Sequence, residues 1–232
     1  MIQVKELSKS FGKLQVLDSI SFDIDQGGIF AILGPNGSGK TTLLKILLGM
    51  VIPDGGEILF QNEDISHTHD YRKNIGYLPQ IARFPDNLKV SEIIAMIKDI
   101  RNEASDSESL VALFGLEKYL DKKLGNLSGG TRQKVNIVLT FMFDTPVIVL
   151  DEPTAGLDPV SLIKLKDLIN KEKSRGKIIL ITSHIMTLVE ELASEIVFLL
   201  EGRIYFKGTI TELKTATKTE DLEHAIAAII EP

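Results

Sequence analysis

The chain has 232 residues, of which 44% are hydrophobic and 25% charged, so one large domain with a buried core is expected. The formal net charge of −6 argues against a general nucleic-acid-binding surface, and the lack of cysteine excludes disulfides, thiolate metal sites and cysteine nucleophiles. The first residues lack a signal-peptide pattern, and no apolar run approaches the ~18 residues that would span a membrane.

Residues 1–33 have the pattern of β-strands that lead into a glycine-rich loop. Ile2–Leu7 and Val16–Ile24 alternate in part, and Ile29–Leu33 is apolar throughout, as in a buried strand. The loop that follows is Gly34-Pro35-Asn36-Gly37-Ser38-Gly39-Lys40-Thr41-Thr42. Leu43–Leu48 then has helical spacing. This order of strand, glycine-rich loop, lysine, threonine and helix is typical of a P-loop.

The residue types of this loop suit the binding of phosphate. Glycine lets the backbone turn tightly and bring successive N–H groups around a phosphate, and the helix start adds the positive end of its dipole. Lys40 would reach the β- and γ-phosphates, and the Thr41 hydroxyl would coordinate Mg²⁺. A simple turn with an exposed lysine is the alternative, but the flanking strand and helix favour nucleotide binding.

The middle of the chain predicts a helical lobe inserted into an α/β core. Ile75–Gln80 has the pattern of a buried strand that ends at Gln80, and no strong strand follows until about residue 145. Val90–Arg101 and Ser107–Leu116 have helical spacing instead. Before this lobe, a polar stretch contains the pair His67 and His69, which lacks a third ligand nearby and is therefore interpreted as a solvated loop.

The segment Leu127-Ser128-Gly129-Gly130 leads into a helix predicted over Thr131–Phe143. A Ser-Gly-Gly helix start brings together a hydroxyl, bare backbone N–H groups and the helix dipole, which makes an anion site. A capped helix after a flexible turn accounts for the same residues, and physical chemistry alone favours that interpretation.

Two further buried strands end in functional side chains. Val147–Leu150 is followed by Asp151 and Glu152, and Lys177–Ile181 is followed by Thr182-Ser183-His184. The carboxyl ends of strands form the ligand edge of an open α/β sheet. Asp151 suits a Mg²⁺ site there, and Glu152 suits a base that polarises water. His184 at the same edge is interpreted as functional.

The last part of the chain continues the α/β pattern and ends in a tail. Val160–Ser174 and Ile185–Leu192 have helical spacing, and the last strands are Glu195–Leu200 and Arg203–Lys207. In the tail, Thr219–Ile230 predicts a short amphipathic helix that docks on the body of the domain.

Over nearly the whole chain, these motifs in this order resemble the nucleotide-binding subunits of ATP-binding-cassette (ABC) transporters. The matching positions are the adenine-stacking aromatic Phe11, the Walker A loop Gly34–Thr42, the glutamine-loop residue Gln80, the signature motif Leu127–Gly130, the Walker B residues Asp151 and Glu152, the D-loop residues Leu157 and Asp158, and the switch histidine His184.

The resemblance implies an α/β fold: a P-loop NTPase core with an N-terminal antiparallel β layer and an inserted α-helical subdomain. One ABC ATPase domain would span residues 1–232. Residues 1–80 and 144–208 would form the α/β core with its β layer, 81–143 the helical subdomain with the signature motif, and 209–232 a C-terminal helical tail.

The resemblance also implies hydrolysis of ATP with Mg²⁺, and it gives each residue a role. Thr41, Gln80 and Asp151 would hold Mg²⁺, while Glu152 would polarise the attacking water and His184 would position that water at the γ-phosphate. The catalytic set would be Lys40, Gln80, Glu152 and His184. Phe11 would stack on adenine, and the residues expected to bind the nucleotide through the P-loop are Gly34, Pro35, Asn36, Gly37, Ser38, Gly39, Lys40, Thr41 and Thr42.

In the family, the signature motif faces the nucleotide of the opposite subunit. Ser128, Gly129 and Gly130 would accordingly contact the ATP of a second ATP-binding subunit, with a homodimer expected. Thr131 stands where the family usually has glutamine, and an altered contact on the ribose side is expected from it.

The implied partners are this second subunit and an integral membrane permease subunit, with no nucleic acid. The expected location is cytoplasmic, peripheral on the inner face of the cell membrane. The alternative is a soluble ABC ATPase that acts on ribosomes or DNA. One cassette, a short uninterrupted lobe and an acidic balance favour the transporter. The substrate and the direction of transport stay open at this stage.

Overall fold

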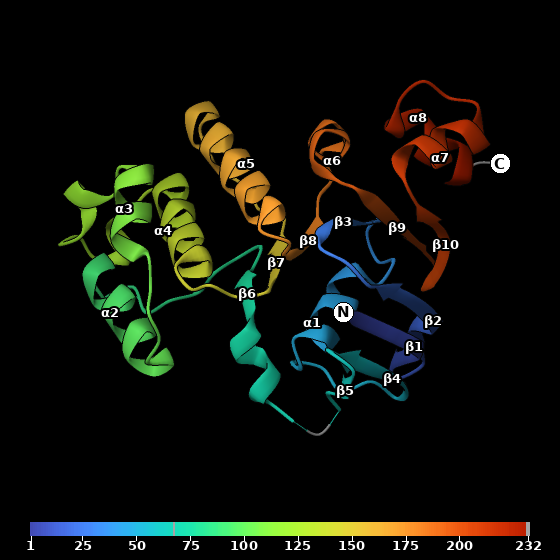
Figure 1. Ribbon diagram of the computed structural model, residues 1–232, viewed down its shortest axis with the longest axis horizontal. Helices are drawn as coiled ribbons and strands as arrows, with labels where there is room; N and C mark the ends of the chain where they lie inside the picture. Colours follow the sequence, from blue (N-terminus) through green and yellow to red (C-terminus); the bar gives the residue numbers. More distant parts are fainter. Residues whose placement is uncertain (67, 231–232) are drawn as a thin grey trace.

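The strands form two sheets in the computed structural model, which describes residues 1–66 and 68–230 (Figure 1). The smaller sheet has the strand order β2-β1-β4-β5 and is antiparallel throughout. Its strands are β1 (Ile2–Phe11), β2 (Leu14–Ile24), β4 (Gly55–Phe60) and β5 (Glu63–Asp64). The larger sheet has the order β10-β9-β3-β8-β7-β6. Its strands are β3 (Gly28–Leu33), β6 (Ile75–Leu78), β7 (Val147–Asp151), β8 (Ile178–Thr182), β9 (Glu195–Leu200) and β10 (Arg203–Gly208).

The larger sheet is parallel except for its edge strand β10, which pairs antiparallel with β9. Every residue of β3, β7 and β8 is buried, as expected for parallel strands covered on both faces. Alternate side chains of β3 enter different cores: Phe30 and Ile32 pack toward α1 (Lys40–Leu47) and the antiparallel sheet, and Ile29 packs with the helical lobe. Figure 1 shows α1 between the two sheets.

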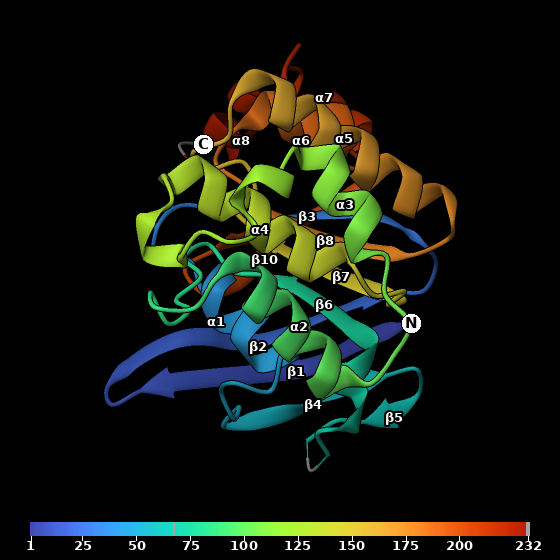
Figure 2. The ribbon, with the colours of Figure 1, turned by 90° about the vertical axis from the view of Figure 1, so that its left-hand side faces the viewer.

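The other face of the larger sheet is covered by helices, and the lobe shares its core. Val90 and Leu110 of the lobe belong to the same buried cluster as Ile148 and Leu150 of the sheet. Figure 2 shows this lobe in front of the sheets. Its elements are α2 (Val90–Arg101), α3 (Ser107–Phe114), the 3₁₀ helices η2 (Glu117–Tyr119) and η3 (Leu124–Asn126), and α4 (Gly129–Phe141). After the lobe come α5 (Pro159–Ser174) and α6 (Met186–Leu192).

The tail folds into two helices, α7 (Ile210–Thr217) and α8 (Leu222–Ile230), where one was predicted. Leu222 and Ala225 of α8 are buried against Val189 of α6, so the tail docks on the body as expected. The missed helix α7 begins with a capping box formed by Thr209 and Glu212. That pattern is visible in the sequence as a Thr-x-x-Glu spacing.

Several predicted boundaries differ from the structure. α1 begins at Lys40, three residues earlier than Leu43, because the last P-loop residues already belong to its first turn. The short strand β5 and the 3₁₀ helix η1 (Asp70–Asn74) were not predicted, since two- and five-residue elements have no measurable periodicity. In the histidine pair, His69 precedes η1 and His67 lies outside the described residues.

Residues 1–66 and 68–230 contain neither a helix that could span a membrane nor a cluster of side chains that could hold a metal ion. None of the helices there is both long and apolar enough to cross a membrane. Within those ranges, no three histidine, cysteine or acidic side chains are grouped so as to hold a metal ion.

Candidate nucleotide-binding site

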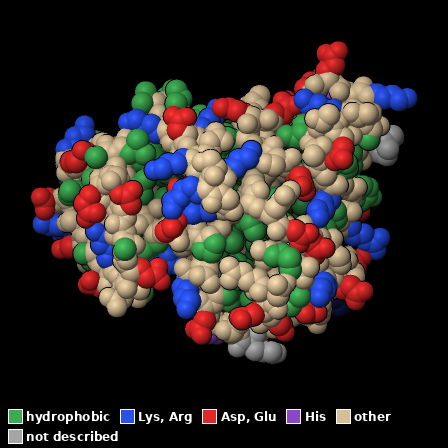
Figure 3. Space-filling view, in the orientation of Figure 1, with side chains coloured by type: hydrophobic (Ala, Val, Ile, Leu, Met, Phe, Trp, Pro, Cys, Tyr) green, Lys and Arg blue, Asp and Glu red, His purple; other side chains and the backbone are tan. Residues whose placement is uncertain are grey.

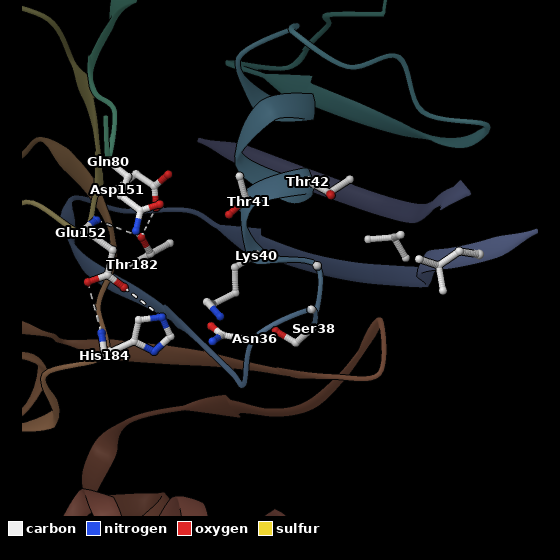
Figure 4. Close-up of a pocket in the computed structure, with 14 residues that line it drawn as sticks. Asn36, Ser38, Lys40, Thr41, Thr42, Gln80, Asp151, Glu152, Thr182 and His184 are labelled. Carbon is white, nitrogen blue, oxygen red and sulfur yellow. Dashed lines mark hydrogen bonds and ion pairs between the residues drawn. The ribbon is translucent and has the colours of Figure 1, made fainter. Parts of the chain in front are cut away.

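The carboxyl ends of the parallel strands meet at one cavity of about 270 Å³, drawn in Figure 4. The P-loop follows β3. Asp151 ends β7 and Glu152 follows it, Thr182 ends β8, and His184 and Gln80 lie two residues beyond β8 and β6. The predicted site residues that line this cavity are Asn36, Gly37, Ser38, Gly39, Lys40, Thr41, Thr42, Gln80, Asp151, Glu152 and His184. Parallel pairing therefore brings together motifs up to 148 residues apart, from Asn36 to His184.

The P-loop backbone needs glycine at two crowded positions. Gly34 has φ 146°, and a Cβ there would lie 2.1 Å from the carbonyl oxygen of Leu199. Gly39 has φ 105°, and its Cβ would lie 2.6 Å from Leu17 Cδ2. The loop is thus wedged between β9 and β2, and side chains at these positions would push it out of place.

Lys40 extends from the first turn of α1 into the cavity. Its side chain is largely buried, and Nζ donates hydrogen bonds to the carbonyl oxygens of Gly34 at 2.7 Å and Pro35 at 3.0 Å. Burial lowers the pKa of Lys40, and the carboxylates of Glu152 and Asp151 act against that shift. Figure 4 shows the amine nitrogen of Lys40 beside Asn36 of the P-loop. A positive charge in this position suits an anionic ligand.

Thr182 fixes the end of β7, although its role was not predicted. Its hydroxyl donates to Oδ1 of the buried Asp151 at 2.5 Å. The backbone N–H of Glu152 donates to the carbonyl oxygen of Thr182 at 3.1 Å and reaches its hydroxyl at 3.2 Å. The sequence signal for Thr182 was a polar residue at the end of a buried strand, beside His184.

Glu152 and His184 face each other across the cavity edge. His184 Nε2 lies 3.3 Å from Oε1 of Glu152, and the His184 backbone N–H donates to Oε2 at 3.4 Å. The Glu152 side chain is 15% exposed and the His184 side chain 53%, so the carboxylate is sheltered while the imidazole borders the solvent. A carboxylate oriented by a neighbouring group is the arrangement required of a general base.

Phe11 is not among the residues that line the cavity. It ends β1 with 51% of its surface exposed, and its ring lies 5.3 Å from Nζ of Lys9. Leu14 and Val16 of β2 line the cavity instead, and sequence reasoning missed both. Leu14 pairs with Phe11 across the β1–β2 hairpin, so Phe11 lies next to a residue that lines the cavity, and its contact with adenine stays a prediction.

The signature residues also lie outside this cavity. Ser128 is the N-cap of α4, and its Oγ accepts a hydrogen bond from the Thr131 N–H at 3.3 Å. The hydroxyls of Ser128 and Thr131 are 2.9 Å apart and share a second hydrogen bond. Within one chain, the capped-helix interpretation of this motif is therefore correct. Ser128 and Gly129 are exposed, which leaves the helix start accessible from outside.

The fold and the cavity define a P-loop nucleotide-binding ATPase, and comparison with known proteins places it more closely. The sequence model of the ABC transporter family matches residues 17–155. The lantibiotic transport ATP-binding protein SrtF of Streptococcus pyogenes is 34% identical over 206 residues, which cover 88% of this chain and 89% of that protein. The Nod factor export ATP-binding protein I of Ralstonia nicotianae is 34% identical over 224 residues, which cover 93% of this chain and 69% of that protein.

Solved structures support the same family assignment. An ATP-binding subunit of an ABC transporter has a TM-score of 0.93 at 28% identity, with 100% of both chains covered. A dimeric bacterial ABC transporter cassette has a TM-score of 0.80 at 24% identity over 90% of this chain and 99% of the other, which shows a common fold. The chain belongs to the ABC transporter family. It is an ATP-binding and ATP-hydrolysing subunit of a transporter, and the predicted fold class is confirmed.

Proposed function

We propose that the cavity at the carboxyl ends of β3, β7 and β8 is the site of ATP hydrolysis in this subunit. The observation that supports this most strongly is the convergence of Lys40, Asp151, Glu152 and His184 on one cavity from three separate segments of the chain. The P-loop N–H groups and Lys40 bind the phosphates, and Thr41 and Thr42 continue this contact at the helix start. Gly34 and Pro35 do not line the cavity, and in this proposal they give the loop its shape.

The residues present also fit Mg²⁺. The ion prefers oxygen ligands and usually keeps only one or two from the protein beside substrate phosphates and water. Thr41, Gln80 and Asp151 supply a hydroxyl, an amide oxygen and a carboxylate to the same cavity. Asp151 is already oriented by Thr182 through Oδ1. When bound, Mg²⁺ would neutralise developing charge on the phosphates.

Glu152 is the general base in this proposal. Its carboxylate accepts a proton from the attacking water, and His184 orients the carboxylate and the water beside the γ-phosphate. The left-handed backbone of Glu152, with φ 50°, aims its side chain toward His184. Phe11 stays proposed as an adenine contact, with Leu14 beside it in the hairpin. The rate of ATP hydrolysis by Glu152→Gln tests this proposal.

We propose that the active unit is a homodimer in which Ser128, Gly129 and Gly130 contact the ATP of the second copy. The exposed helix start lies outside its own chain's cavity and carries the donors that an anion needs. Because the chain has no cysteine, single cysteines can test this arrangement. Asn36 is exposed in the P-loop, whereas Ser38 is buried, so Asn36→Cys is the better probe.

Asn36→Cys and Ser128→Cys, each combined with Glu152→Gln so that ATP is not consumed, should cross-link on mixing through a short bis-thiol reagent. The cross-linked dimer should depend on ATP and Mg²⁺, because ligand stabilises the closed state. Dimer formation by light scattering without this cross-link would show that the signature motif does not face the second nucleotide.

We further propose that the subunit works on a membrane permease, at the cytoplasmic face, and drives export. The support for export is that relatives are named for lantibiotic transport and Nod factor export.

In the segment after Gln80, Ile81 is exposed while Phe84 packs partly against the core, so Ile81 is the better candidate for a permease contact. Ile81→Asp should abolish co-purification with the permease at unchanged ATPase activity, and Tyr205→Asp, an exposed position on β10, serves as the control.

No role on nucleic acid is proposed. On the face shown in Figure 3, acidic and basic side chains are intermixed over the whole surface, and the chain has a net charge of −6. A nucleic-acid-binding ATPase would need a basic footprint for phosphate contacts. We propose that residues 1–80 and 144–208 form the α/β core, 81–143 the helical subdomain and 209–232 the tail of one domain.

A further inference from the structure

The first two turns of α4 are attached to the segment that follows Glu152. Nε2 of Gln133 donates to the carbonyl oxygen of Pro153 at 3.0 Å, and Nζ of Lys134 lies 2.7 Å from Oδ2 of Asp158. Gly130 approaches the same segment so closely that a Cβ there would lie 2.5 Å from the carbonyl oxygen of Gly156. Residues 153–158 are therefore held from one side by a single helix.

Of these three contacts, the one from Gln133 is buried and reaches the residue that directly follows Glu152 in the chain. The Gln133 side chain is 6% exposed, and its amide orientation is determined by its two neighbours. The carbonyl of Pro153 can only accept, so Nε2 must face it, and Oε1 then accepts from Nδ2 of Asn136 at 3.3 Å. Asn136 is itself buried, so this pair forms a polar network inside α4 that ends on the Pro153 carbonyl.

Glu152 needs such support because its backbone is in the left-handed region. A φ of 50° is costly for a residue with a side chain, and it persists only where the surroundings fix it. On the N-terminal side, the Glu152 N–H bonds to Thr182 on β8. On the C-terminal side, proline supplies no N–H. The Glu152 carbonyl accepts a long hydrogen bond from the Ala155 N–H at 3.4 Å, and the Pro153 carbonyl accepts the shorter one from Gln133 at 3.0 Å.

We propose that Gln133 is a positioning residue for ATP hydrolysis: through the Pro153 carbonyl it holds the backbone turn that aims Glu152 at the attacking water. The inference rests on the proposed role of Glu152 as general base. Gln133 does not line the cavity and touches no substrate, so its loss should misplace the base without removing any contact to ATP.

The test compares Gln133→Met with Thr140→Val in steady-state and single-turnover ATP hydrolysis. Methionine keeps the length and volume of glutamine but donates no hydrogen bond. Thr140 is a matched control because it is buried on the same helix and donates to the carbonyl oxygens of Asn136 at 2.8 Å and Tyr77 at 3.1 Å, away from Pro153. Both variants lose a buried hydrogen bond, so a similar fall in melting temperature is expected.

We expect kcat to fall roughly 10- to 100-fold in Gln133→Met, since small misplacement of a catalytic group costs about that much, while ATP affinity and KM change by less than about two-fold. Thr140→Val should keep the wild-type kcat. In the Glu152→Gln background, Gln133→Met should cause no further loss, because the group that it positions is already absent.

A wild-type kcat in Gln133→Met, or an equal loss of kcat in Thr140→Val, would overturn the inference while leaving the role of Glu152 intact. Wild-type hydrolysis in Glu152→Gln would instead overturn the proposed function itself. If Gln133→Met does not fold, Gln133→Asn keeps a polar amide that is too short to reach Pro153, and the same comparison of kcat with KM applies.

Discussion

His184 approaches Glu152 by two atoms: its Nε2 lies 3.3 Å from Oε1, and its backbone N–H donates to Oε2 at 3.4 Å. One carboxylate oxygen thus accepts a hydrogen bond from His184, and the other lies beside its ring; His184 itself follows the neighbouring strand β8. The distance between these two residues is set by the parallel pairing of β7 with β8, in which Asp151 is opposite Thr182. Because the sheet fixes the ends of both strands, the Glu152 carboxylate is held in one position beside His184, where it can act as a base.

Glu152→Gln keeps the size of the side chain and removes the carboxylate. We expect the rate of ATP hydrolysis to fall at least ~100-fold, the usual scale for the loss of a general base. ATP binding should persist, because the P-loop and Lys40 are unchanged. Phosphate release and equilibrium ATP binding measure the two effects separately, and near-normal turnover would contradict the assignment of the base.

His184→Ala should lower kcat at least about 10-fold while ATP affinity is largely retained, because the orienting contact to Glu152 is lost. His224→Ala is the matched control: this histidine is exposed on α8, contacts Asp221 and does not line the cavity. Steady-state hydrolysis of both variants measures the difference. Equal activities would show that His184 has no role in the reaction.

Lys40→Ala should weaken ATP binding itself. A charged hydrogen bond to phosphate contributes about 1.5–3 kcal/mol, so we expect the dissociation constant to rise at least about 10-fold. Lys45→Ala on the exposed face of α1 should bind ATP normally. The measurement is the rise of melting temperature with added MgATP, which should persist in Lys45→Ala and be reduced in Lys40→Ala. Identical shifts in the two variants would remove Lys40 from the phosphate site.

The contact between Asp221 and His224 at the start of α8 predicts that the stability of the protein depends on pH. The Asp221 carboxylate, through its hydrogen bond to the ring, raises the pKa of His224 above its usual 6.5. In turn, the backbone N–H and ring of His224 lower the pKa of Asp221 below 3.8. The His224 contribution is complete below the unfolded pKa of 6.5 and is lost as pH rises through the higher folded pKa. The Asp221 contribution is complete above 3.8 and is lost as pH falls through the lower folded pKa.

The difference in melting temperature between wild type and His224→Gln should therefore be largest at about pH 5–6 and should shrink by about pH 8.5. Both side chains are largely exposed, so the effect should be small and weaker at high salt. A difference that is constant from pH 5 to 8.5 would exclude a charged His224–Asp221 pair.

The sequence by itself determined the class of fold and most of the cavity. Buried strands have continuous apolar runs such as Ile29–Leu33, and each ended in the residues that line the site, so Lys40, Asp151, Glu152 and His184 could be assigned from local pattern alone. Their convergence followed from the rule that parallel strands place their carboxyl ends at one edge.

Only the tertiary structure decided contacts between residues that share no local pattern. It placed Leu14 and Val16 at the cavity, because the pairing register of the β1–β2 hairpin is a property of two strands together. It also showed the hydrogen bond from Gln133 to Pro153, since the sequence marks Gln133 only as one polar residue in an apolar helix. Packing between α4 and the end of β7 gives that residue its partner, and no periodicity along the chain contains this information.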